Sequence, residues 1–314
     1  MIDVVTFGEV MGTVRVTGKI GVSNNVALSI AGSEANVAIG LARLGHSARW
    51  AGAVGADGIG DLVVRTLAAE QVDVSHISRD AHFPSGILVS QLSAFGSARV
   101  DYHRRQSAGS RVTAMQVRTA CTPHPRIVHA SGITPAISER AAEATRDAVM
   151  WAKEQGLTIS FDVNYRSRLW SEDAAREALI PIAGLCDIVI GGPEEIALIA
   201  PSGEDWKAQA ESLHALKGAE IVVKRGSEGA ATLREGQWTH SPAFDVTVVD
   251  PIGAGDAFVA GYLSGVLDSL DVDARLRRAN ALGGCSVATS GDWEGLPSRS
   301  EMEAFTGASG DVLR

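Results

Sequence analysis

Short runs of β-branched residues alternate with longer segments of helical period along most of this chain, and that alternation limits the folds open to it. Helical segments such as 138–154 and 173–183 separate the runs. Strands are predicted at 4–7, 127–130, 158–162, 187–190 and 220–224. Alternating strands and helices are typical of a parallel sheet with crossover helices, and apolar runs such as IVI and IVV fit strands covered on both faces. The sequence therefore predicts an α/β fold, with a mainly parallel central sheet flanked by helices.

Two stretches, at about 11–30 and 85–106, depart from this alternation. The first contains VRV and VALSI, and the second contains GILVSQLSA and ARVDYHRR. Paired β runs with turn residues between them and no helix predict antiparallel hairpins. We expect these strands to form a small β-sheet lid over the active-site end of the main sheet. With no internal repeat or linker, the simplest organisation is one domain over 1–314 that carries the lid as insertions.

Composition narrows the partners and the compartment. The formal net charge of −9 argues against non-specific nucleic-acid binding, which needs clustered Lys and Arg. No apolar stretch approaches the roughly 18 residues that a membrane span requires, and the N-terminus lacks the basic start of a signal peptide. The three cysteines, at positions 121, 186 and 285, form no C-x-x-C pair. A cytoplasmic protein that binds neither nucleic acid nor membrane is expected.

The segment 250–256, DPIGAGD, carries the clearest chemical signal. An apolar helical segment follows it, with Val259, Leu263, Val266 and Leu270 spaced as one buried face. A helix that begins with two glycines presents free backbone N–H groups at the positive end of its dipole, which is an anion site. The N–H groups of Gly253, Ala254 and Gly255 would supply it.

Asp256 is the unusual member of this segment, because a carboxylate would repel an anion unless it is there to accept a proton. Phosphoryl transfer explains the combination: the amides would hold the moving phosphoryl group, and Asp256 would accept the proton of an attacking hydroxyl. A glycine-rich turn with an ordinary N-terminal aspartate is the structural alternative. Neither GxxxxGK[ST] nor a well-placed GxGxxG occurs, so a P-loop or a Rossmann dinucleotide site is unsupported.

Several motifs in order resemble the ribokinase-like (PfkB) family of carbohydrate kinases over nearly the whole chain. They are AGSEAN at 31–36 with VAIGLARLG after it, GAVGADGIG at 52–60, and DPIGAGD at 250–256. Three further stretches resemble the 2-keto-3-deoxygluconate kinase branch: FDVNYR with a following LW at 161–170, YHRR at 102–105, and GDWEGLP at 291–297. The resemblance implies a ribokinase-like fold and ATP-dependent phosphorylation of a sugar or sugar acid hydroxyl.

The resemblance implies that the sugar is bound by Gly32, Asn36, Tyr102, Arg104 and Arg166, together with Asp256. A keto-deoxy sugar acid carries a carboxylate, which arginine binds in bidentate fashion, and the basic YHRR stretch therefore favours an acid over a neutral sugar. The structural alternative for Asn36 is a helix cap or a buried hydrogen bond. For Arg104 it is a solvated lid edge.

For ATP, the resemblance implies contacts from the turn after strand 220–224 and from the glycine-rich helix start. The implied residues are Lys224, Ser227, Gly229, Gly253, Gly255 and Asn280. A strand-end turn that needs glycine's torsional freedom is the alternative for the first three. A solvated helix position is the alternative for Asn280.

The metal side departs from the family. Relatives commonly have N-x-x-E where this chain reads GPEE, so Gly192 replaces the asparagine while Glu195 remains to organise Mg²⁺ through water. Ala31 stands where a glycine pair is common, which would narrow the sugar pocket. A monovalent cation and a homodimer through the lid are further possibilities that the family raises.

The function expected is therefore ATP-dependent phosphorylation of 2-keto-3-deoxygluconate or a close sugar acid, with Asp256 as general base and the amides of Gly253–Gly255 as anion hole. One alternative is a fructokinase- or ribokinase-type kinase of a neutral sugar. Another is a catalytically silent, sugar-binding relative, which Gly192 keeps open and the intact Asp256 opposes.

Overall fold

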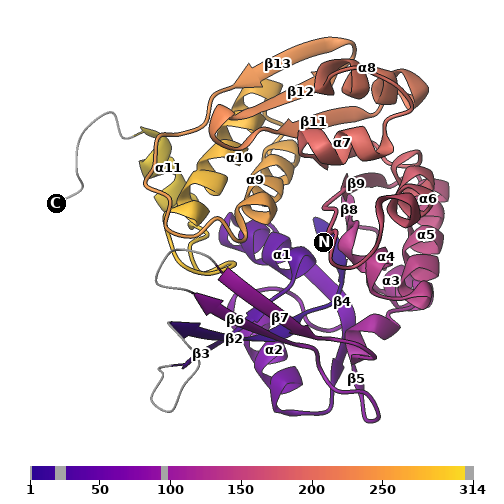
Figure 1. The fold of residues 1–314 in the computed structure, drawn as a ribbon, viewed down its shortest axis with the longest axis vertical. Helices are drawn as coiled ribbons and strands as arrows, with labels where there is room; N and C mark the ends of the chain where they lie inside the picture. Colours follow the sequence, from indigo (N-terminus) through magenta and orange to yellow (C-terminus); the bar gives the residue numbers. More distant parts are fainter. Residues whose placement is uncertain (1, 18–25, 93–97, 308–314) are drawn as a thin grey trace.

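The computed structural model describes residues 2–17, 26–92 and 98–307, and its described strands form two sheets (Figure 1). The larger sheet has nine strands in the order β13-β12-β11-β10-β9-β8-β1-β4-β5. It is parallel from β5 to β11 and ends in two antiparallel strands. The bounds are β1 Val4–Gly8, β4 Ala48–Gly55, β5 Ile77–Asp80, β8 Ile127–Ser131, β9 Thr158–Asp162, β10 Ile188–Gly191, β11 Glu220–Lys224, β12 Ala230–Arg234 and β13 Gln237–Ser241.

The predicted α/β fold with a mainly parallel sheet is confirmed. All five predicted strands are present as β1, β8, β9, β10 and β11, and the predicted bounds of β9 and β11 match those observed. Their alternate side chains enter opposite cores: Val4 belongs to one buried cluster and Val5 to the other. Burial on both faces explains why these strands read as continuous apolar runs.

Helices cover both faces of this sheet (Figure 1). One core contains residues of α1, α2, α9, α10 and α11, and the other contains residues of α3, α5, α6, α7 and α8. No helix in the described ranges is both long and apolar enough to cross a membrane. The bounds are α1 Ser33–Arg43, α2 Gly58–Ala69, α3 Ala114–Ala120, α4 Ile133–Ile137, α5 Glu139–Glu154, α6 Glu172–Ala183, α7 Pro193–Ile199, α8 Trp206–Lys217, α9 Ala254–Leu267, α10 Val272–Val287 and α11 Arg299–Gly307, with 3₁₀ turns η1 Ala108–Arg111 and η2 Gly226–Glu228.

The smaller sheet, called the lid sheet below, has the order β3-β2-β6-β7 and lies in the lower left part of the view in Figure 1. Its strands are β2 Met11–Thr17, β3 Val26–Ala31, β6 Ile87–Leu92 and β7 Ala98–His103. The two predicted antiparallel pairs are present as β2–β3 and β6–β7. Parallel pairing of β2 with β6 joins them into one sheet. Residues 18–25 and 93–97 of the predicted stretches lie outside the described residues.

Helix α9 was expected to bury one face, and that expectation is wrong. It packs against both α1 and α10, and eleven of its residues are buried, including Tyr262 and Ser264. Gly40 of α1 approaches the Cβ atom of Ala260 on α9. This close crossing places the first turn of α1 beside the first turn of α9, at the carboxyl-terminal edge of the parallel strands, where ligand sites of open α/β sheets lie.

Candidate active site

The first turn of α9 forms one wall of the site. Gly253 caps the helix with a φ of +81°, and a Cβ atom at this position would lie 1.9 Å from the carbonyl oxygen of Asp292. Any other residue would therefore be strained and would clash. No side chain caps this end of α9, so the N–H groups of its first turn can bind an anion. The predicted roles of Ala254 and Gly255 as amide donors fit this geometry.

Asp256 lies within that first turn and is held by two neutral donors from α1. The hydroxyl of Ser33 donates to Oδ1 of Asp256 at 2.7 Å, and Nδ2 of Asn36 donates to Oδ2 at 2.8 Å. Nδ2 of Asn164 in turn donates to the Ser33 hydroxyl at 2.9 Å. Both donors are uncharged amide or hydroxyl groups, so these hydrogen bonds orient the Asp256 carboxylate without an ion pair. Asn36, predicted to contact sugar directly, fixes Asp256 in this structure, and its own Oδ1 has no partner among the described residues.

A cavity of about 640 Å³ opens in front of Asp256. It is bounded by the first turns of α1 and α9, by lid strands β2, β6 and β7, and by the loop after β9. Five cations line it, Arg15, Arg104, Arg166, Arg168 and Lys224, as do six acids, Glu9, Glu34, Asp162, Glu195, Asp256 and Asp292. Because the charges nearly balance, anion binding depends on which cations are already paired.

Arg104 stands at the end of β7 and is already paired. Its Nη2 lies 2.5 Å from Oε2 of the buried Glu9, and the Ser107 hydroxyl donates to the other oxygen of Glu9. The Arg104 guanidinium also lies 5.9 Å from the ring centre of Tyr102. The alternative of a solvated lid edge is wrong for Arg104, because its side chain is only 11% exposed. Its Nε remains without a hydrogen-bond partner among the described residues, so it keeps a donor to offer.

Arg166 differs from Arg104 because it is exposed and makes no ion pair with any described residue, although it lines the cavity. The nearby Arg168 donates from Nη1 to the carbonyl oxygen of Val100 on β7 at 2.8 Å. That bond ties the loop after β9 to the lid sheet. Arg166, Arg104 and Tyr102 all line the cavity.

Two buried acids of the cavity titrate near neutral pH. Burial raises the pKa of Glu34 to about 7, although a hydrogen bond from Thr134 opposes the shift. Burial also raises the pKa of Asp292 to about 7 against the opposing charge of Arg15, whose Nη2 lies 3.1 Å from Oδ1 of Asp292. The chemistry near Asp256 can therefore be pH-dependent for reasons outside Asp256 itself.

Lys224, predicted to meet phosphate, is engaged by a carboxylate here. Its Nζ contacts both oxygens of Asp162, at 2.8 and 3.0 Å, and lies 3.9 Å from Glu195. Burial alone would lower the pKa of Lys224, but the two carboxylates raise it. Burial raises the pKa of Asp162 to about 6 despite the lysine. The ammonium also stands near the anion site, 3.6 Å from where a Cβ atom of Gly255 would lie.

Gly192 and Glu195 form the start of α7. Oε2 of Glu195 accepts from the Gly192 N–H at 2.7 Å, and Oε1 accepts from the Tyr165 N–H at 3.0 Å. Gly192 therefore lacks the side chain of the asparagine expected at this position, but its backbone N–H still binds Glu195. No cluster of three or more metal-ligating side chains occurs in the described part of the chain.

Three of the residues predicted to bind ATP, Ser227, Gly229 and Asn280, do not line the cavity. Ser227 is exposed on η2. Gly229, with a φ of +84°, is required by the turn itself, since a Cβ atom there would lie 2.1 Å from the Ser241 carbonyl oxygen. Nδ2 of the buried Asn280 donates to the carbonyl oxygens of Ser241 and Pro242, so a solvated position is wrong for it. Gly32 lines the cavity but is also required by packing, because its Cβ atom would lie 2.5 Å from the Glu9 carbonyl oxygen.

Five residues of the site were not singled out from the sequence as site residues: Ser33, Asn164, Glu9, Asp162 and Asp292. A signal existed for three of them. Ser33 lies inside the AGSEAN stretch, and Asp162 and Asn164 are the first two letters of D-x-N-x-R. Glu9 follows β1 and Asp292 lies in the GDWEGLP stretch, where a lone acid gives no indication of what it faces.

Comparison with known proteins agrees with this geometry. A family model described as pfkB family carbohydrate kinase matches residues 1–299. A 2-dehydro-3-deoxygluconokinase of Bacillus subtilis is 35% identical over 99% of this chain and 97% of its own length. A fructokinase of Escherichia coli is 32% identical over 87% of this chain and 90% of its own length.

A solved kinase structure has a similar fold. A candidate ribokinase II of Escherichia coli, in complex with ATP and Mg²⁺, superposes with a TM-score of 0.88 at 27% identity, over 98% of this chain and 99% of its own.

Proposed function

This chain belongs to the pfkB family of carbohydrate kinases, and on that premise we propose that it transfers the γ-phosphoryl group of ATP to a hydroxyl of 2-keto-3-deoxygluconate (2-dehydro-3-deoxygluconate). The family and the enzyme class, a phosphotransferase with an alcohol acceptor, agree with the expectation from the sequence. The acceptor, the donor and the residue roles are the proposal.

The proposal depends above all on Asp256. Its carboxylate is oriented by Ser33 and Asn36 and lines the cavity, in the same helical turn as the amide N–H groups suited to an anion. In the transfer, the acceptor oxygen forms a bond to phosphorus, the bond to the ADP oxygen breaks, and the hydroxyl proton passes to Asp256. The amides of Gly253, Ala254 and Gly255 stabilise the charge on the moving group.

The acid end of the acceptor is assigned to Arg104, Arg166 and Tyr102. Arg166 has no ion pair with a described residue, and Arg104 retains a free Nε beside Glu9. Together they can receive a carboxylate by charge-assisted hydrogen bonds. The Bacillus subtilis relative is named for this acceptor, which supports the assignment.

On the nucleotide side, the Lys224 ammonium lies 3.6 Å from where a Cβ atom of Gly255 would lie, and we assign it to the phosphates. Ser227, Gly229 and Asn280 stay predictions for ATP contacts. Mg²⁺ suits the donors present, since it prefers carboxylate oxygens and keeps several waters, and Glu195 would hold it through water. When bound, Mg²⁺ neutralises phosphate charge. The Escherichia coli structural relative holds both ATP and Mg²⁺. A monovalent cation, a homodimer through the lid sheet and a cytoplasmic location stay predictions.

A neutral sugar is the second candidate acceptor, and the Glu9–Arg104 pair favours it. Glu9 already neutralises the more buried of the two arginines, which weakens the attraction for a carboxylate. The Escherichia coli relative named fructokinase is similar over 87% of this chain.

The two candidates are separated by ADP release measured over a panel of 2-keto-3-deoxygluconate, fructose and ribose, with the product identified by mass spectrometry. We expect the highest kcat/KM with the keto-deoxy acid. Equal or better turnover with fructose or ribose would overturn the assignment of the acceptor. No ADP release with any sugar would support the catalytically silent relative.

Arg104→Ala tests the acid end within the same panel. The KM for the keto-deoxy acid is expected to rise about 10- to 100-fold, as for the loss of a charged hydrogen bond, with little change for neutral sugars. Arg104→Lys is the matched control, because it keeps a cation beside Glu9 and removes only the planar fork. An equal KM increase for acid and neutral sugars would mean that Arg104 serves structure alone.

A further inference from the structure

Residues 291–294 connect the lid sheet to the anion-binding turn of α9. Several of the contacts that make this connection involve the side chain of Glu294. Oε1 of Glu294 accepts from the hydroxyl of Ser29 on β3 at 2.7 Å and lies 3.8 Å from Nη1 of Arg15 on β2. Its Oε2 accepts from the Trp293 N–H at 3.2 Å. One carboxylate therefore contacts two lid strands and the backbone of its own segment.

The neighbours of Glu294 reinforce this link to the lid sheet. Nε1 of Trp293 donates to the carbonyl oxygen of Ile30 on β3 at 3.1 Å. Arg15 reaches Asp292 with its other terminal nitrogen at 3.1 Å. All these contacts join side chains or backbone that are buried or half-buried, and such contacts hold their geometry better than exposed ion pairs.

The other side of the same segment contacts the anion-binding turn. The Gly291 N–H donates to Oδ2 of Asp250 at 3.3 Å, and Oδ1 of Asp250 accepts from the Ile252 N–H at 3.1 Å. The backbone of Asp292 lies directly against Gly253, leaving no room there for a Cβ atom. The backbone of residues 291–292 therefore supports the turn that carries the amides of Gly253–Gly255, and a displacement of these residues would shift that turn.

We propose that Glu294 is a positioning residue for phosphoryl transfer, which holds the anion-binding turn in register with the lid strands that close the sugar cavity. The inference rests on the proposed function, because it assigns the transferred group to that turn. Glu294 itself is not among the residues that line the cavity. Its effect reaches the reaction through Asp292 and Gly253.

The physical consequence concerns the balance between two reactions of ATP. Transfer to a sugar hydroxyl forms the sugar phosphate and ADP, whereas attack by water forms inorganic phosphate and ADP. Transfer needs the turn and the sugar to be aligned, and small misplacements are costly for such a step. Hydrolysis by mobile water needs no such alignment with the lid sheet. Loosening the link should thus lower transfer more than hydrolysis.

The test compares Glu294→Ala with wild type, measuring sugar phosphate and inorganic phosphate separately at saturating ATP. The kcat for transfer is expected to fall about 10- to 100-fold, with the KM for ATP near its wild-type value and a raised ratio of hydrolysis to transfer. Ser29→Ala, which removes a single hydrogen bond to Glu294 from the lid side, should shift the ratio in the same direction by less. This milder variant keeps the test usable if Glu294→Ala folds poorly.

Glu70→Gln is the matched control. Glu70 pairs with Arg43 at 2.7 Å, and Arg43 binds the carbonyl oxygens of Trp293, Glu294 and Leu296 from the α1 side, with no hydrogen bond or ion pair to a described residue of the lid sheet. This variant should lower the thermal midpoint and leave the ratio unchanged. An unchanged ratio in Glu294→Ala and Ser29→Ala, with or without lost stability, would overturn the proposal. If the preferred acceptor proves to be neutral, the ratio is measured with that sugar, so the two proposals fail separately.

Discussion

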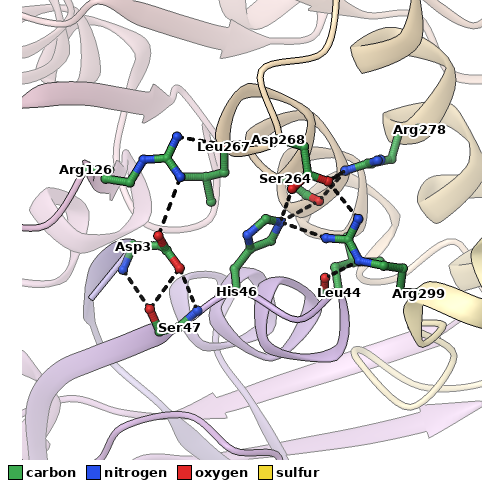
Figure 2. A network of polar contacts seen from close by, with 10 residues as sticks. All are labelled: Asp3, Leu44, His46, Ser47, Arg126, Ser264, Leu267, Asp268, Arg278 and Arg299. Carbon is green, nitrogen blue, oxygen red and sulfur yellow. Dashed lines mark hydrogen bonds and ion pairs between the residues drawn. The ribbon is translucent and has the colours of Figure 1, made fainter. Parts of the chain in front are cut away.

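The two ends of helix α9 each carry an aspartate, and their surroundings differ in charge. Asp256, in the first turn, receives hydrogen bonds from a serine hydroxyl and an asparagine amide. Asp268, which caps the last turn, receives them from two arginines, with Nη1 of Arg278 at 2.5 Å and Nη1 of Arg299 at 2.7 Å (Figure 2). The same residue type therefore serves two different purposes along one helix.

The helix dipole and the neighbouring side chains explain why Asp256 and Asp268 have different surroundings. A carboxylate is favoured at a helix N-terminus and disfavoured at a C-terminus, so Asp268 needs its arginines. Burial would raise the pKa of Asp268, but hydrogen bonds from Arg299 and Arg278 lower it to about 2. A carboxylate held by cations is a poor proton acceptor. Among the described residues, the side chains that donate hydrogen bonds to Asp256 are neutral, and Asp256 lines a cavity.

A substitution of Asp256, in the first turn of α9, should have the largest effect on turnover. Asp256→Asn keeps the size of the side chain but removes the proton acceptor, so kcat is expected to fall about 10²- to 10⁴-fold. The thermal midpoint should change little, because Asn can still bond Ser33. Coupled ADP release and thermal unfolding measure the two effects. Undiminished turnover would remove Asp256 as the base.

A substitution of Asp268, at the last turn of α9, should instead lower stability and leave turnover unchanged. Asp268→Asn leaves Arg278 and Arg299 without their shared carboxylate, and the free energy of unfolding is expected to fall by about 1–2 kcal/mol, the lower range because the side chain is partly exposed. The kcat should stay near its wild-type value. Urea unfolding checks the stability. A loss of kcat comparable to that of Asp256→Asn would contradict the contrast between the two ends.

Much of this arrangement could be predicted from local sequence. The parallel strands, the lid hairpins and the glycine-rich start of α9 each depend on short patterns, and the structure has all three. The partnership of Asn36 with Asp256 spans 220 positions. It depends on how closely α1 crosses α9, which no local pattern specifies.

The pairing of the charged groups could not be predicted for the same reason. Lys224 and Asp162 are 62 positions apart and meet because β9, β10 and β11 are neighbours in the sheet. Glu9 follows β1 and Arg104 follows β7, and the tertiary fold alone brings the two together. The burial of α9 on several sides was missed because a spacing of four, three and four identifies one apolar face and gives no information about a second layer.

The pH dependence of stability should show the smallest effect and sharpen the comparison further. The pKa of Asp268 is lowered on folding, so its contribution to the free energy of unfolding is complete above about pH 4 and is lost as the pH falls towards 2. Burial lowers the pKa of the adjacent His46 below 6.5, so protonation of His46 destabilises the fold as the pH falls below that value. Urea unfolding of wild type and Asp268→Asn across this range should show their difference shrinking below pH 4. A constant difference would mean that the Asp268 charge is not what stabilises this end.

The assignment of the base is tested most directly by the pH dependence of kcat/KM in wild type and Asp256→Asn, measured with the preferred acceptor. Asp162, Glu34 and Asp292 also titrate within or beside the cavity, so a change in rate at one pH does not identify the group responsible. If Asp256 accepts the proton, wild-type activity falls on the acid side as its carboxylate is protonated, and that acid limb is absent from the residual activity of the variant. An acid limb of the same shape in Asp256→Asn would contradict the assignment and direct the search to another carboxylate.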